Sequence, residues 1–124
     1  KKDYVCNNNP PTFPEGLDVE VFTFSTLKKC FISAKTQFQK EHVTQYIHQN
    51  KKKFSFHNIL NKINLSHYRL TVDTKEDYIF SKEVYKKLYK KNKQFVMSDI
   101  LCLIEKQKEL LKINSNVKKS DLYK

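Results

Sequence analysis

Residues 66–77 constrain the fold more than any other stretch of this 124-residue chain. Apolar side chains alternate with polar ones from Tyr68 to Asp73, which predicts a β-strand. Thr74 follows as a favourable helix N-cap, and Thr74-x-x-Asp77 approximates a capping box, with Asp where Glu or Gln is usual. The stretch therefore predicts a strand that passes at once into a helix.

Asp73 stands at the end of that strand, where many α/β proteins bind their ligands. In open α/β sheets, ligands bind outside the carboxyl ends of the strands. A carboxylate at this position could hold a metal ion, or it could help to cap the helix that begins at Lys75. The local spacing agrees with both interpretations, so both stay open at this point.

The composition limits the class of protein. Hydrophobic residues make up 39% of the chain, with nine Phe and seven Tyr, which is enough for one small core. The single glycine excludes a Gly-rich low-complexity chain. No apolar run approaches the roughly 20 residues of a membrane span, and the polar residues 1–4 do not begin a signal peptide. We therefore expect no membrane partner.

Cysteine usage indicates the redox compartment. The three cysteines lie far apart and show no metal-ligand spacing, either with each other or with histidine; they are Cys6, Cys30 and Cys102. Isolated thiols of this kind fit a reducing environment. We expect a cytoplasmic location.

The net charge of +11 raises the alternative of a basic nucleic-acid-binding domain. Arg69 is the single arginine of the chain. Proteins that read nucleic acids usually use arginine for bidentate contacts with bases and phosphates. The abundance of Lys, Asn and Ile is typical of a compositional bias in the source genome. We therefore expect no nucleic-acid partner.

Periodicity predicts a single α/β domain over residues 1–124 without internal repeats. Besides 68–73, strands are expected at 3–6, 17–24 and 54–63. Helices are expected at 25–39 (capped by Ser25 or Thr26), 40–50, 75–91, 98–106 (capped by Ser98) and 108–113. A turn at 51–53 and a polar tail at 115–124 complete the prediction.

Two of these elements carry predictions about which side chains are buried. In strand 17–24, Leu17, Val19 and Val21 are expected to face the core, so that Asp18 and Glu20 line a site or meet water. In helix 75–91 the apolar side is expected to comprise Phe80, Val84, Leu88, Tyr78, Tyr85 and Tyr89.

Four segments together resemble a known family. They are DYVCN (3–7) followed by PPTFPEGLDVEVF (10–22), EHVTQYI (41–47), LSHYRLTVDTKED (65–77) and LLKIN (110–114). Their order and spacing resemble the C-terminal half of cytidylyltransferases of the spore coat polysaccharide biosynthesis protein F type. These enzymes are related to the CMP-Kdo and CMP-sialic acid (acylneuraminate) synthetases. The likeness extends over nearly the whole chain.

The resemblance implies a fold and a reaction. The implied fold is the C-terminal portion of a GT-A-like nucleotide-diphospho-sugar transferase, a three-layer α/β/α sandwich with a mixed sheet. The implied reaction transfers CMP from CTP to an activated or acidic sugar and releases pyrophosphate, for the synthesis of surface polysaccharide. Mg²⁺ would hold the phosphates, and Asp73 matches the family's metal-binding carboxylate. The resemblance thus favours metal binding by Asp73 over capping.

The same comparison gives candidate substrate-binding residues, each with a structural alternative. Asp18 and Glu20 could face the sugar or simply meet water, and His42 could orient a substrate group or serve as a hydrogen-bonded structural residue. Arg69 could bind a carboxylate or phosphate, or pair with Asp18 or Glu20. The loop that follows the first strand could touch substrate through Asn7 and Asn8.

The remaining histidines carry less weight. His67 is a weaker candidate, and His48 and His57 show no feature that indicates a site.

The chain departs from the family pattern because the N-terminal half is not in this sequence. In the family, that half carries the triphosphate-binding loop, the base-recognition residues and the other metal aspartate. We expect the isolated chain to be inactive and to need the missing half or a homodimer partner. Two alternatives remain: a non-catalytic interaction or dimerisation module, and the nucleic-acid-binding domain above.

Overall fold

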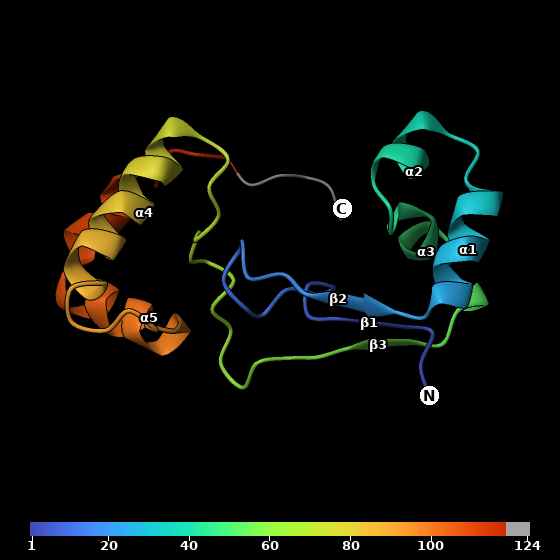
Figure 1. Cartoon of the computed structure of the whole chain (residues 1–124), viewed down its shortest axis with the longest axis horizontal. Helices are drawn as coiled ribbons and strands as arrows, with labels where there is room; N and C mark the ends of the chain where they lie inside the picture. The colour runs from blue at the N-terminus through green and yellow to red at the C-terminus, as the bar shows by residue number, and fades with distance from the viewer. Residues whose placement is uncertain (119–124) are drawn as a thin grey trace. The chain divides into compact units, whose positions relative to one another are not determined.

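The structure is a computed structural model in which residues 1–118 are described, so residues 119–124 of the expected tail lie outside the described part. The chain divides into two compact units, Lys1–His67 and 68–118 (Figure 1). The first unit contains a sheet and short helices, whereas the second is helical. The described chain is therefore α/β with a mixed sheet, in agreement with the predicted class.

The first unit is built on a three-stranded sheet with the order β2-β1-β3. The strands are β1 (Tyr4–Cys6), β2 (Glu20–Phe22) and β3 (Phe56–Asn58). β1 runs antiparallel to β2 and parallel to β3, and Cys6 stands opposite both Glu20 and Asn58. The carboxyl ends of β1 and β3 and the start of β2 therefore share one edge of the sheet.

One face of this sheet packs against helices. The helices are α1 (Phe24–Ser33), α2 (Gln37–Glu41) and α3 (Gln45–Gln49), with a 3₁₀ turn η1 (Lys51–Lys53). The buried core joins Tyr4 and Cys6 of β1 to Cys30 of α1 and Ile47 of α3, together with Phe54. Alternate residues of β1 thus point to the covered face, as the strand period requires.

The predicted helices 25–39 and 40–50 are wrong in their boundaries. α1 begins one residue after Thr23, whose hydroxyl accepts from the Thr26 N–H, and it ends where Ala34 becomes extended. Thr36 then starts a new helix through a capping box with Gln39. A second N-cap within a helical pattern ends the first helix and reorients the chain, which periodicity alone did not reveal.

Strand 17–24 is shorter than predicted, and its two faces are reversed. Only Glu20–Phe22 is a strand, and Val19 and Val21 are 57% and 61% exposed. Glu20 instead points to the covered face, because Tyr4, Thr44 and His48 provide it with hydrogen bonds there. Strand 54–63 likewise reduces to Phe56–Asn58.

The second unit is a helical hairpin with a short 3₁₀ segment. It contains α4 (Lys75–Leu88), α5 (Met97–Lys106) and η2 (Lys108–Lys112). The Thr74–Asp77 capping box is confirmed. The predicted cap at Ser98 is wrong: α5 begins after Val96, and Asp99 accepts from the Val96 N–H.

The core of the second unit confirms part of the predicted face of α4. Its buried members are Phe80 and Val84 of α4 with Ile104 and Leu110. The three tyrosines expected on this face are exposed instead, with 46% to 59% of their surface accessible; they are Tyr78, Tyr85 and Tyr89. Phe80 and Val84 are four residues apart and form the narrow stripe that one partner helix can cover.

The predicted strand 68–73 is not among the strands of the described chain. Tyr68 and Leu70 pack on the core of the second unit. Arg69, which stands between them in the sequence, is buried as well. A strand needs hydrogen bonds to a neighbouring strand, and the sheet of the described residues consists of β1, β2 and β3. Val72, the third apolar residue of the alternation, is 56% exposed, and Arg69 of the polar set is buried, so the alternation predicted neither the strand nor its buried face.

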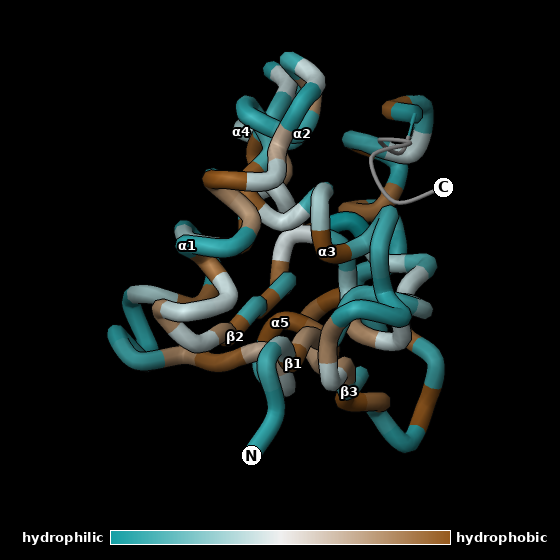
Figure 2. The backbone as a smooth tube through the Cα atoms, turned by 90° about the vertical axis from the view of Figure 1, so that its right-hand side faces the viewer, coloured by the Kyte–Doolittle hydropathy of each residue, from teal (hydrophilic) through white to brown (hydrophobic). Residues whose placement is uncertain are grey.

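Hydrophobic residues lie in short stretches along the backbone, separated by polar ones (Figure 2). In keeping with this, no helix within residues 1–118 has the length and apolar character needed to cross a membrane.

Candidate functional site

The strand-end edge of the first unit carries a cluster of polar side chains centred on Glu20. Its Oε1 accepts hydrogen bonds from the Tyr4 hydroxyl, from Thr44 Oγ1 at 3.2 Å and from His48 Nε2 at 3.4 Å. Burial would raise the pKa of Glu20, but the hydrogen bonds from His48, Tyr4 and Thr44 outweigh it and hold the pKa below its usual range. Glu20 is therefore a fixed carboxylate.

His48 connects this carboxylate to the loop that follows β1. Its side chain is 7% exposed. Its Nε2 lies 3.0 Å from the Tyr4 hydroxyl, and its Nδ1 lies 2.9 Å from Asn9 Nδ2. Burial and the neighbouring Glu20 raise the pKa of Tyr4 strongly, so this phenol stays protonated and can donate.

The two candidate asparagines of the loop have different surroundings. The Asn7 amide donates to the Leu17 carbonyl at 2.9 Å and accepts from the Val19 N–H at 2.8 Å, so it fixes the approach to β2. Asn8 is 3% exposed, yet neither Nδ2 nor Oδ1 has a hydrogen-bond partner within residues 1–118. Burying an amide without a hydrogen-bond partner costs about 1–3 kcal/mol of folding free energy. A polar group from a ligand or another chain could therefore bind favourably at this position.

Asp18 and His42 lie apart from the hydrogen bonds of Glu20. Asp18 is exposed, and partial burial of its carboxyl group together with the nearby charges of Glu15 and Glu20 raises its pKa. His42 ends α2, and its ring contacts Phe38 edge-on with a centroid distance of 4.7 Å. The structure thus shows an aromatic contact for His42.

In the second unit, Arg69 forms an ion pair with a carboxylate. Its Nε and Nη2 donate to the two oxygens of Asp77 at 3.0 and 2.8 Å, and Nη2 also lies 3.3 Å from Asp73 Oδ2. Asp77 is fully buried. The Arg69 guanidinium, with further hydrogen bonds from Asn114 and from the Asp73 backbone, outweighs burial and holds the pKa of Asp77 far below its usual range. Arg69 thus has a carboxylate partner, which is Asp77 rather than the expected Asp18 or Glu20.

Asp73 is the candidate metal ligand, and its side chain is 64% exposed. Its Oδ2 accepts from Thr71 Oγ1 at 3.2 Å and from Arg69, which leaves Oδ1 accessible. Mg²⁺ is commonly held by one or two carboxylates and keeps several waters, so an exposed carboxylate of this kind fits it. Within residues 1–118 there is no group of three or more His, Cys, Asp and Glu side chains that could hold a metal, so further ligands would come from substrate, water or another chain.

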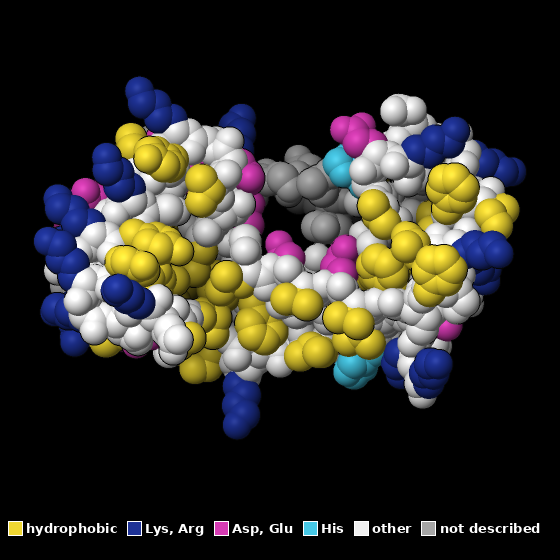
Figure 3. Space-filling view, in the orientation of Figure 1, with side chains coloured by type: hydrophobic (Ala, Val, Ile, Leu, Met, Phe, Trp, Pro, Cys, Tyr) yellow, Lys and Arg dark blue, Asp and Glu magenta, His cyan; other side chains and the backbone are white. Residues whose placement is uncertain are grey.

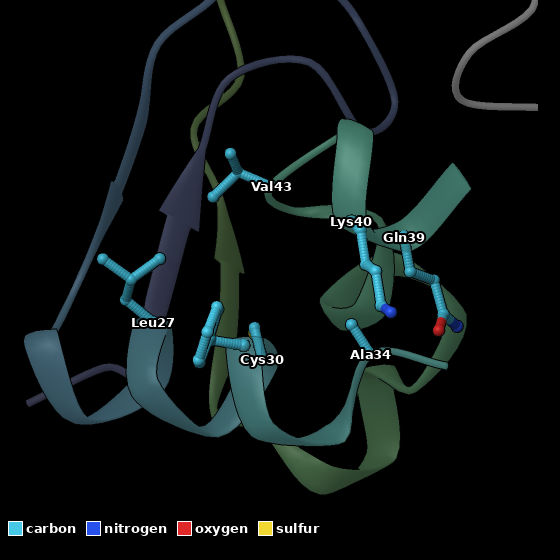
Figure 4. Close-up of a pocket in the computed structure, with 7 residues that line it drawn as sticks. Leu27, Cys30, Ala34, Gln39, Lys40 and Val43 are labelled. Carbon is cyan, nitrogen blue, oxygen red and sulfur yellow. The ribbon is translucent and has the colours of Figure 1, made fainter. Parts of the chain in front are cut away.

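A separate pocket of about 480 Å³ opens between α1 and α2 in the first unit (Figure 4). Leu27 and Cys30 of α1, with Ala34 directly after it, form one side, and Gln39 and Lys40 of α2 form another. The Gln39 amide already accepts from the N–H groups of residues 35 and 36. The pocket is mainly apolar, and none of the candidate site residues lines it.

Sequence reasoning missed His48, Asp77 and Asn114. His48 carried no sequence signal, because its partners Tyr4 and Glu20 are 44 and 28 residues away. Asp77 had a usable signal, since a buried arginine needs a carboxylate and the single arginine precedes this cap residue by eight positions.

Comparison with known proteins shows what this chain is similar to. No protein-family model matches it. An uncharacterised protein, MJ1063 of Methanocaldococcus jannaschii, is 35% identical over 118 residues, which are 94% of this chain and 46% of that protein. A cytidylyltransferase from Leptospira borgpetersenii matches 95% of this chain and 48% of its own, with 30% identity and a TM-score of 0.83. The chain thus spans about half the length of both relatives and has a cytidylyltransferase-like fold.

Proposed function

We propose that this chain supplies one half of a sugar cytidylyltransferase. The complete enzyme would transfer CMP from CTP to an activated or acidic sugar and release pyrophosphate, in the synthesis of surface polysaccharide such as spore coat. The observation that carries the proposal is the close likeness in fold to half of the Leptospira cytidylyltransferase. The GT-A-like three-layer sandwich and the C-terminal position of this half are part of the proposal.

In this proposal Asp73 holds Mg²⁺, and the ion offsets the charge of the phosphates. Its accessible Oδ1 and its 64% exposure support that role. Arg69 restrains the opposite oxygen, and Asp77 in turn fixes Arg69, so the carboxylate is held in place before the metal arrives.

The strand-end cluster of the first unit would contact the sugar. Glu20 offers a fixed negative acceptor for a hydroxyl or amine, and Asp18 lies two residues away at the same edge. The unpartnered Asn8 amide supports a polar ligand or a polar segment of the missing half at this edge. Asn7 acts indirectly by fixing the segment before β2. His42 belongs to the proposal through the family resemblance alone.

A chimera tests this proposal. Residues 1–124 would replace the matching half of the Leptospira enzyme, and CTP-dependent release of pyrophosphate would be measured over a panel of sugars with Mg²⁺. We expect activity in the chimera and none in the 124-residue chain alone. Asp73→Asn should abolish Mg²⁺-dependent turnover, whereas Glu76→Gln, which alters an exposed carboxylate in the first turn of α4, should not. An active Asp73→Asn chimera would refute the metal role, and turnover by the isolated chain would refute the need for a second half.

A non-catalytic interaction module is the second candidate. The observation in its favour is a set of exposed aromatic residues, Tyr78 and Tyr85 on α4 and Tyr89 directly after it. Exposed apolar surface of this kind often marks a protein interface. Its test is the molecular mass in solution, with and without the complementary half: an enzyme half should change mass only when that half is present, whereas a self-associating module should form oligomers by itself.

A further inference from the structure

An unbroken series of hydrogen bonds links Lys51 to Glu20 in the first unit. Lys51 Nζ lies 2.9 Å from Asn9 Oδ1, and Asn9 Nδ2 lies 2.9 Å from His48 Nδ1. His48 Nε2 lies 3.0 Å from the Tyr4 hydroxyl, which donates to Glu20 Oε1. The series joins η1, the loop after β1, α3, β1 and β2, and its residues come from three separate parts of the sequence, 4–9, 20 and 48–51.

The charges at the two ends fix the direction of every donor in the series. An ammonium group can only donate, so the amide oxygen of Asn9 must face Lys51, and its NH₂ group must therefore face His48 Nδ1. That nitrogen has to accept, which places the imidazole proton on Nε2. Nε2 then donates to the Tyr4 oxygen, and the Tyr4 hydrogen is directed to the Glu20 carboxylate, which can only accept.

Lys51 is itself held in place. Its ammonium lies 5.3 Å from the centroid of the Phe56 ring, in addition to its contact with Asn9. The neighbouring Lys52, also exposed on η1, has no recorded contact with this series within residues 1–118.

At the other end, the hydrogen bonds to Glu20 are unequally divided between its two oxygens. Oε1 accepts from Tyr4, Thr44 and His48, whereas Oε2 has no protein hydrogen bond within residues 1–118. The Glu20 side chain is 20% exposed. One oxygen is thus anchored, and the other is left to accept from a ligand at the strand-end edge.

We propose that His48 is a positioning residue of this site. The Lys51–Asn9 pair holds His48 as the neutral Nε2–H tautomer. Through Tyr4, His48 keeps Glu20 oriented so that Oε2 is available to a hydroxyl or ammonium group. The nature of that ligand rests on the proposed function. The tautomer and the positioning of Glu20 do not, so they can be tested on the 124-residue chain without any enzyme assay.

The first test determines the tautomer of His48 directly by NMR. The full chain is labelled with ¹⁵N-histidine and long-range ¹H–¹⁵N spectra are recorded at slightly alkaline pH, with His48 identified by the loss of its signals in His48→Phe. We expect the Nε2–H pattern for His48. Asn9→Asp places a carboxylate against Nδ1 and should move a proton onto that nitrogen. Lys51→Met should weaken the preference for one tautomer, and the matched control Lys52→Met should not.

The second test measures whether His48 affects the carboxyl group of Glu20. The titration of its carboxyl group is followed by ¹³C NMR in the unaltered chain, in His48→Phe and in His57→Phe, whose histidine is exposed on the opposite face of the sheet. We expect an upward shift of the Glu20 midpoint in His48→Phe alone. An Nδ1–H or doubly protonated His48 in the unaltered chain, or an unchanged Glu20 midpoint in His48→Phe, would overturn the proposal. Lys51→Met alters an exposed side chain, so it keeps the tautomer test decisive if Asn9→Asp fails to fold.

Discussion

Arg69 donates through Nε and Nη2 to the two oxygens of Asp77, at 3.0 and 2.8 Å. The same carboxylate accepts from the backbone N–H groups of Asp73 and Thr74 and from the Asn114 amide. Asn114 also donates to the Arg69 carbonyl. One buried ion pair therefore ties the segment before α4, the start of α4 and the segment after η2 into one structure.

Replacing Asp77 with Asn should strongly destabilise the second unit. The substitution keeps the shape of the side chain but removes the buried charge that pairs with the Arg69 guanidinium at 2.8 Å. Breaking a buried pair by removing one partner costs about 3–5 kcal/mol. Urea unfolding followed by the tyrosine fluorescence of α4 would measure the loss. Glu76→Gln, one residue away on the exposed side, should change the unfolding free energy by less than about 0.5 kcal/mol.

The same pair should make the second unit sensitive to acid. The pKa of Asp77 is lowered in the folded chain, so the unfolded chain binds the extra proton first as the pH falls. The stabilisation is therefore complete above the unfolded pKa, at about pH 4, and declines below it. Urea midpoints measured between pH 7 and pH 3 should fall more steeply in the unaltered chain than in Asp77→Asn. Parallel slopes would contradict the assignment.

Glu20→Gln should destabilise the first unit, whereas Asp18→Asn should not. Glu20 accepts three hydrogen bonds on its covered side, and an amide weakens these charge-assisted contacts by about 1–3 kcal/mol in total. Asp18 is exposed, so its neutralisation should stay within about 0.5 kcal/mol. Thermal unfolding of the two variants side by side provides the comparison, and equal effects would argue against an anchored Glu20.

Asp73→Asn should leave the stability of the chain nearly unchanged. Its ion pair with Arg69 is long, at 3.3 Å, and the carboxylate is 64% exposed, so water screens the interaction. We expect a change below about 1 kcal/mol in urea unfolding. A large loss would show that Asp73 serves the fold rather than a ligand.

Binding to nucleic acid should be weak and easily removed by salt. The net charge of +11 attracts any polyanion, and Lys and Arg side chains are scattered over the face seen in Figure 3, between hydrophobic and uncharged ones. The single arginine is buried against Asp77 and cannot reach a base. Fluorescence anisotropy with a DNA duplex and a single strand should therefore show binding at 50 mM salt that is lost by about 200 mM. Tight, sequence-dependent binding at 200 mM would restore the nucleic-acid alternative.

Local features of this protein could be predicted from the amino-acid sequence. The Thr74–Asp77 capping box, the mixed α/β class and strand 4–6 all follow from contacts between residues close in the chain or from side-chain periodicity. The burial of Phe80 and Val84 follows from their helical spacing. Such features could be predicted because their causes lie within a few residues.

Which polar residues lie together depends on the packing of segments that are distant in the sequence. Glu20 was expected on the polar face of its strand, to line a site or meet water, yet it points to the covered face because Tyr4, Thr44 and His48 converge on it from 16, 24 and 28 residues away. Arg69 could have paired with any carboxylate until the fold placed Asp77 against it. A buried charge takes the partner that completes its hydrogen bonds, and that partner is set by how distant segments pack, which local pattern does not encode.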